Sequence, residues 1–134
     1  MNGGYEYNTL FFEHEYLEKM YTKMDTYFRV FGDDISHYQT CQKVGGIFFL
    51  KNTSDNAIIV EEVINLMVEN NYHYINDNPS IKQNDKIFKA HRHDQSVLSL
   101  ISKKYNLYYI KDETWFPNWN SGVNYPILAT RSRN

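Results

Sequence analysis

The sequence predicts a small α/β domain. Segments with strand-like and helix-like hydrophobic patterns follow one another in the order strand, helix, strand, helix, loop, helix, strand, and such alternation is typical of α/β folds. The chain has 134 residues, of which 42% are hydrophobic and 22% charged, so it can bury one core. We therefore expect a single domain over residues 1–134, with a small mixed sheet and about three helices.

The first elements follow from two apolar patterns. Residues 8–12 (NTLFF) indicate a short buried strand. From Glu15 onward, apolar residues recur every three or four positions, which indicates a helix. Gly32 is a residue that commonly ends one. The polar residues 33–42 are predicted to form a loop.

The middle of the chain predicts a strand followed by a second helix. Residues 44–50 (VGGIFFL) consist of a valine, two glycines and an apolar run, which indicates a buried strand. Asn52, Thr53 and Ser54 are favoured at helix N-caps, so a helix is predicted over residues 55–70. The apolar face expected for it consists of Val60, Val63, Ile64, Met67 and Val68.

The last third predicts a long loop, the clearest helix and a final strand. Residues 72–90 are polar and without period, and loops of that length in compact domains are often functional. In the following helix, Asp94 near the start and Lys103 and Lys104 near the end match the helix dipole. Residues 107–110 indicate a strand. The apolar stripe of the helix consists of Val97, Leu98, Ile101 and Tyr105.

Composition argues against several classes of protein. The net charge of -2 is not that of a protein that binds nucleic acid or an anionic membrane surface. The single cysteine, Cys41, cannot form an internal disulfide, which favours a reducing compartment. The first residues lack the pattern of a signal peptide, and no apolar stretch approaches the roughly 20 residues that span a bilayer. We expect a soluble, cytoplasmic protein.

The segment HRHDQS, residues 91–96, is the first candidate site. His91 and His93 would lie on one side of an extended strand, which suits a metal. The helix that follows would favour an anion such as a diphosphate at its N-terminus. The alternative is structural: Asp94 caps the helix by accepting from the Val97 N–H, and the histidines are ordinary polar residues. Spacing alone favours the structural alternative.

Two further segments are weaker candidates. Gly45 and Gly46 would let a ligand approach the backbone closely, although a simple turn explains them equally well. Trp115 and Trp119 could stack on sugar rings, or they could fold over the edge of the core.

Together and in this order, these segments resemble the C-terminal half of a family of GT-A-type nucleotide-sugar glycosyltransferases from large DNA viruses, bacteria and some eukaryotes. The most specific match is HDQS, residues 93–96, within HRHDQSVLSLISKKYNLYYI. A Gly-Gly strand, the polar loop NDNPSI (residues 76–81) and an aromatic final segment (residues 113–133) accompany it. The resemblance covers about residues 10–133.

The resemblance implies a partial GT-A-like fold, a nucleotide-diphosphate-sugar donor, a carbohydrate acceptor and a divalent cation, Mn²⁺ or Mg²⁺. It implies that Asp94 and Gln95 lie near the anomeric carbon of the donor sugar as catalytic residues. The other implied positions are Gly45, Gly46, His91 and His93 toward the donor diphosphate, with His91 or His93 reaching the metal, and Trp115 and Trp119 toward the acceptor.

Members of this family carry an Asp-x-Asp motif in an N-terminal, donor-binding half, and the present sequence contains no such motif. The sequence begins about where that half would end, so we expect the acceptor-side half of a glycosyltransferase, working with a separate donor half or as a homo-oligomer. Two alternatives stay open. One is a non-catalytic module that binds carbohydrate or a protein partner. The other is a small metal-dependent hydrolase that uses His91, His93 and Asp94.

Overall fold

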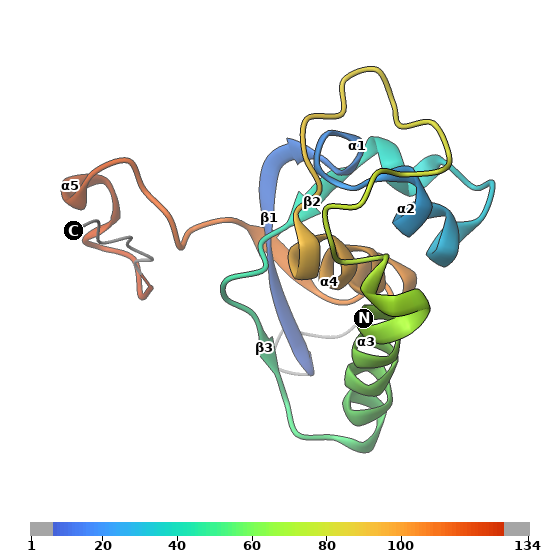
Figure 1. The fold of residues 1–134 in the computed structure, drawn as a ribbon. Helices are drawn as coiled ribbons and strands as arrows, with labels where there is room; N and C mark the ends of the chain where they lie inside the picture. Colours follow the sequence, from blue (N-terminus) through green and yellow to red (C-terminus); the bar gives the residue numbers. More distant parts are fainter. Residues whose placement is uncertain (1–6, 128–134) are drawn as a thin grey trace.

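The chain folds around a small, open, mixed sheet, and the computed structural model describes residues 7–127 (Figure 1). The strands are β1 (Thr9–Leu17), β2 (Cys41–Lys43), β3 (Phe49–Leu50) and β4 (Tyr109–Lys111). The helices of the described part are α1 (Glu18–Tyr21), α2 (Met24–Phe31), the short 3-10 helix η2 (Ser36–Gln39), α3 (Ser54–Tyr72), α4 (His93–Lys104) and α5 (Trp119–Gly122). The predicted α/β class and the mixed sheet are confirmed.

Strand β1 is the centre of the sheet. It pairs antiparallel with β2 and β3, and parallel with β4. Phe11 lies opposite Tyr109 in the parallel pair, and Glu13 lies opposite Lys43 in the antiparallel pair. An irregularity in the β1–β2 register follows Glu13, where β1 bends toward α1. Since β1 and β4 are parallel, their carboxyl ends lie at one edge of the sheet.

The single helix predicted from Glu15 to Gly32 is wrong at its start. The chain stays extended as far as Leu17, and Thr22 and Lys23 are also extended, so α1 and α2 are separate. The break is held by a distant residue, because the Lys23 N–H donates to His91 Nδ1 over 3.1 Å. Gly32 ends α2 as predicted, with a φ of 60° that glycine adopts without strain.

The strand predicted over residues 44–50 is also interrupted. Its first part leaves the sheet after the Val44 N–H has donated to the Phe12 carbonyl over 2.7 Å. The next N–H, of Gly45, donates to the Gln95 side chain instead of to a strand. Only Phe49 and Leu50 return to pair with β1, and Phe49 is exposed rather than buried.

Helix α3 begins as predicted, with the Thr53 hydroxyl accepting from the Asn56 N–H over 3.1 Å. The predicted apolar face is only partly correct, because the buried residues are Ile59, Val63 and Leu66. These three residues pack against Val97 and Ile101 of α4 to form the main apolar core. The predicted face residues that remain exposed are Val60, Ile64 and Val68.

The long polar loop between α3 and α4 is confirmed and lies over the α1–α2 junction (Figure 1). The Lys89 N–H donates to the Met20 carbonyl, and the Met24 N–H donates to Asn84 Oδ1. These contacts fix the position of Arg92, the last residue of the loop, at the start of α4.

The segment after β4 carries α5 away from the sheet and the other helices (Figure 1). Residues 128–133 of the predicted aromatic final segment, and the side chain of Trp119, lie outside the described residues. Among the helices described within residues 7–127, none is both long and apolar enough to cross a membrane.

Candidate functional site

Gln95 and Arg92, at the start of α4, lie beside His14 of β1 and Asp112 after β4. Two further candidate residues, Gly45 and Asp94, adjoin Gln95. The Asp112 N–H, directly after β4, donates to the Glu13 carbonyl over 3.0 Å, which fixes the two strand ends side by side. In open α/β sheets, ligands bind at the carboxyl ends of parallel strands, next to helix N-termini. This edge is therefore the place to look for a site.

Gln95, in the first turn of α4, has its side-chain amide held from two sides. Its Oε1 accepts from the Gly45 N–H over 3.0 Å, and its Nε2 donates to Gln42 Oε1 over 2.7 Å. The His14 ring is a third neighbour of this amide. An amide has two donor hydrogens and an oxygen with two lone pairs, so part of its capacity remains for other groups. Gln95 is thus a partly exposed polar group with a fixed orientation.

The two glycines of the predicted Gly-Gly site have different roles. A Cβ atom on residue 45 would lie 2.6 Å from Gln95 Cβ, so only glycine allows α4 to approach the β2–β3 connection this closely. A Cβ atom on Gly46 would have no neighbour within 4 Å. Gly45 therefore serves the contact with Gln95, and Gly46 has no comparable constraint.

Asp94 is exposed beside Gln95, and its predicted capping role is wrong. The helix begins two residues earlier than a cap at Asp94 requires, with Arg92 at the N-cap position, so Asp94 lies inside the first turn. Its Oδ1 accepts from the Gln95 N–H over 3.0 Å and not from the Val97 N–H. The Ser96 hydroxyl accepts from the Arg92 N–H over 3.1 Å at this helix end. The Asp94 carboxylate therefore faces solvent at the site.

His91 and His93 do not act as a pair. His91 is 7% exposed, its Nδ1 accepts from the Lys23 N–H, and its Nε2 donates to the Tyr74 carbonyl over 2.7 Å. Burial lowers the pKa of His91 to about 4, so the ring is neutral at physiological pH. His93 is exposed and contacts Asp77 over 2.7 Å, and the two imidazole centroids are 6.0 Å apart and nearly perpendicular.

These contacts do not fit a metal centre. Both ring nitrogens of His91 are occupied by backbone groups, so neither is free to bind a metal. Within residues 7–127, no group of three or more histidine, cysteine, aspartate or glutamate side chains could hold a metal ion. The hydrolase alternative therefore lacks a set of metal ligands in the described residues.

An apolar cavity of about 270 Å³ opens next to the site, between β1, α3 and α4. Asp94 and Gly45 lie at its rim, and Phe11, Phe48 and Leu98 are among the residues that line it. The cavity is lined mainly by apolar side chains, whereas the Asp94 carboxylate stays in contact with solvent.

Trp115 is exposed in the segment that follows β4, with 61% of its surface accessible. It is available for stacking, as the prediction of an acceptor contact requires, but no contact joins it to Gln95. The prediction for Trp119 falls outside the described side chains.

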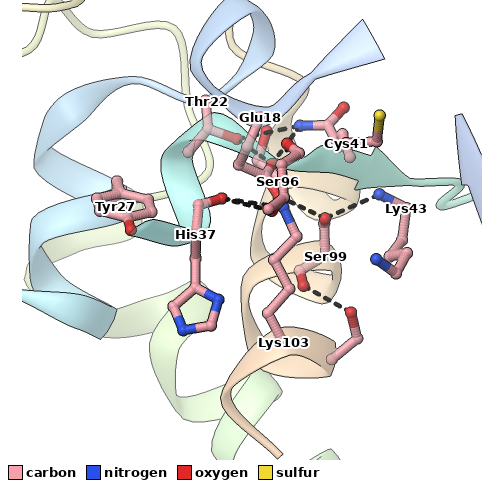
Figure 2. Close-up of polar contacts among 12 residues, drawn as sticks. Glu18, Thr22, Tyr27, His37, Cys41, Lys43, Ser96, Ser99 and Lys103 are labelled. Atoms are coloured by element: carbon pink, nitrogen blue, oxygen red, sulfur yellow. Dashed lines mark hydrogen bonds and ion pairs between the residues drawn. The ribbon is translucent and has the colours of Figure 1, made fainter. Parts of the chain in front are cut away.

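A buried polar cluster is centred on Glu18 (Figure 2). The Glu18 carboxylate is fully buried, and its Oε1 accepts from Ser99 Oγ and Lys103 Nζ, both over 2.6 Å. Its Oε2 accepts from Thr22 Oγ1 and Gln42 Nε2, both over 2.7 Å. The carboxylate thereby joins α1, β2 and α4 through groups that are all satisfied, as buried charges require.

Gln42 connects this cluster to the site. Its Nε2 donates to Glu18, and its Oε1 accepts from the Gln95 amide. The sequence analysis missed Gln42, because nothing in a short polar stretch before a glycine pair signals burial. Its 1% exposed surface is a property of the packed fold.

The sequence analysis also missed His14 and Tyr16, which lie on the last part of β1. The alternation Phe12, His14, Tyr16 was available as a signal of one strand face, but the predicted strand ended at Phe12 and a helix was predicted from Glu15. The His14 and Tyr16 rings are 5.9 Å apart, and Tyr16 packs edge-on against Tyr21 at 5.4 Å. His14 is half-buried next to Gln95 and thus belongs to the same edge.

Comparisons of this chain with protein-family models, with curated proteins and with solved structures find no match. The functional interpretation therefore depends on the geometry of the site and on the sequence resemblance.

Proposed function

We propose that this chain is the sugar-facing half of a nucleotide-sugar-dependent glycosyltransferase, with a partial GT-A-like fold. The observation that carries the proposal is the pairing of an exposed carboxylate, Asp94, with an orientationally fixed amide, Gln95, at the carboxyl ends of two parallel strands. The order of HDQS and its neighbouring segments in the sequence supports the same function.

The chemistry of the two side chains suits glycosyl transfer. Departure of a nucleotide diphosphate leaves positive charge on the anomeric carbon and ring oxygen of the sugar. A carboxylate at the Asp94 position would stabilise that charge, and the Gln95 amide would hold a sugar hydroxyl in one orientation. Because two contacts already fix the amide, it would lose little conformational entropy when a sugar binds.

The proposal includes a donor-binding region outside this sequence. The 134 residues contain no Asp-x-Asp motif, and the described side chains offer no metal cluster. The divalent cation and most contacts with the nucleotide would therefore come from another polypeptide segment or chain. This chain alone should contact the sugar of a nucleotide sugar more closely than the base.

A second candidate is a non-catalytic carbohydrate-binding module. The exposed Trp115 favours it, because an accessible indole face stacks on the apolar face of a pyranose without any catalytic group. In that case sugar binding would depend on Trp115, and Asp94 and Gln95 would contribute nothing.

Saturation-transfer NMR with the folded chain tests the proposal, using UDP-glucose, UDP-galactose and GDP-mannose, each with and without Mg²⁺. We expect stronger saturation of the hexose protons than of the base protons for at least one donor. Asp94→Asn should weaken its binding about tenfold, since charge-assisted hydrogen bonds are the stronger ones. Asp55→Asn is the matched control, because Asp55 is also exposed in the first turn of a helix, α3.

Two results would contradict the proposal. One is that a folded chain binds none of these donors. The other is binding that Asp94→Asn and Gln95→Ala both leave unchanged, particularly if Trp115→Ala abolishes it, which would favour the non-catalytic module.

A further inference from the structure

The end of β1 carries a surface that neither the sequence resemblance nor the proposed roles of Asp94 and Gln95 use. Tyr16 is 46% exposed there, yet its ring is held in place by the edge-on contact with Tyr21. Tyr21 in turn lies under the guanidinium of Arg92, which is 4.1 Å from the ring centroid. An exposed but fixed aromatic ring is a suitable platform for the apolar face of a pyranose.

One planar polar group, the His14 imidazole, lies beside this ring, and a second, the Arg92 guanidinium, lies over the neighbouring ring of Tyr21. His14 is centred 5.9 Å from Tyr16 on the same strand, and Arg92 directly precedes α4. Imidazole, guanidinium and amide groups present donors and acceptors at the rim of a ring site, where sugar hydroxyls would meet them. His14 connects the Tyr16 ring to the Gln95 side chain, so the surface is continuous with the site already described.

The charges at this surface favour a neutral ligand over a phosphate. Arg92 and Asp112, at the end of β4, both lie close enough to His14 to change its pKa, and their charges act in opposite directions. Burial lowers the pKa of His14, and the neighbouring Asp112 opposes that shift only in part, so the ring is neutral at physiological pH. The groups at the surface thus lack the excess positive charge that a phosphate site needs.

We propose that His14, Tyr16 and Arg92 form the acceptor subsite of this chain, and that its ligand is a neutral hexoside stacked on Tyr16 with hydroxyls toward His14 and Gln95. The inference rests on the proposed function, and it assigns the acceptor to the end of β1 instead of to Trp115. It also places the attacking hydroxyl of the acceptor, which would lie between the Tyr16 ring and the donor sugar held by Gln95.

Saturation-transfer NMR tests the subsite with methyl β-D-galactopyranoside, methyl β-D-glucopyranoside and methyl α-D-mannopyranoside as probes. We expect at least one hexoside to bind the wild-type chain. Tyr16→Ala should weaken that binding about fivefold, which is the usual contribution of one aromatic contact, and Tyr16→Phe should retain it. Tyr105→Ala is the control, because Tyr105 is similarly exposed (38%) but lies at the opposite end of α4.

The outcomes separate this inference from the proposed function. If nucleotide sugars bind as expected but no hexoside does, or if Trp115→Ala removes hexoside binding and Tyr16→Ala does not, the subsite is overturned and the proposed function stands. If a hexoside binds through Tyr16 while no nucleotide sugar binds, the subsite stands and the donor role of Asp94 and Gln95 fails. The dispersion of the amide spectrum verifies that each variant is folded.

Discussion

Helix α4 packs against two regions of opposite character, and they contribute differently to the site. On one side, Val97 and Ile101 meet the apolar face of α3. On the other side, Ser99 and Lys103 meet the buried carboxylate of Glu18. The apolar contact buries side chains but does not require a particular orientation of any group. The polar contact requires each donor at a defined position, and it is the polar side that leads through Gln42 to Gln95.

The stability of the fold and the positioning of the Gln95 side chain thus depend on different faces of α4. An apolar contact is the sum of many individually weak dispersion interactions, and none of them requires a particular orientation of a donor or acceptor. A buried ion pair gains little over an apolar pair, and it becomes costly when one partner is removed. We therefore expect substitutions on the polar side to lower the free energy of unfolding more than substitutions on the apolar side. We also expect them to weaken ligand binding at the site.

Glu18→Gln should have the largest effect. The amide keeps the shape of the side chain but leaves the ammonium of Lys103, whose side chain is 6% exposed, without its carboxylate. Breaking one partner of a buried pair costs about 3–5 kcal/mol, which chemical denaturation would measure. Glu61→Gln on the exposed side of α3 is the control and should change stability by less than about 0.5 kcal/mol. A loss of similar size in both variants would show that the polar side has no special role.

The next effect is a pH dependence that comes from the polar loop in front of α4. The pKa of His91 is lowered from 6.5 to about 4 in the folded chain. Between these values the unfolded chain binds a proton that the folded chain does not, so the free energy of unfolding falls as the pH drops. The loss should approach about 3 kcal/mol at pH 4. Denaturation curves between pH 7 and pH 4 should show a shallower slope for His91→Gln, and equal slopes would refute the assignment.

The smallest effect is expected on the apolar side. Ile101→Val removes one buried methyl group from the contact with α3 and should cost about 1 kcal/mol, while leaving ligand binding unchanged. Ile64→Val deletes the same group from a side chain that is 54% exposed and should be nearly neutral. The comparison would need revision if Ile101→Val weakened sugar binding as much as Gln95→Ala.

Local signals in the sequence predicted the parts of the fold that local chemistry determines. Thr53 starts α3 and Gly32 ends α2 because one hydroxyl and one left-handed backbone position suffice for each. Helix α4 was predicted to within two residues at its start, since its apolar stripe and terminal lysines are both local features.

The incorrect predictions of secondary structure have long-range causes. The helix break at Lys23 depends on His91, which is 68 residues away in the sequence, and the break after Val44 depends on Gln95, 50 residues from Gly45. At the site, Asp94 and Gln95 were predicted as candidates and remain so. His14 was not, because the predicted strand ended at Phe12, two residues before it, whereas β1 continues to Leu17.

The close contact between Gly45 and Gln95 has a consequence for how such sequences diverge. A methyl group at position 45 would push the first turn of α4 away from the β2–β3 connection. The need for glycine at this position is therefore steric and does not depend on which ligand the site binds. Position 46 has open space and is free to drift. Distant homologues should therefore retain one glycine of the pair, and a search pattern that demands both would overlook some of them.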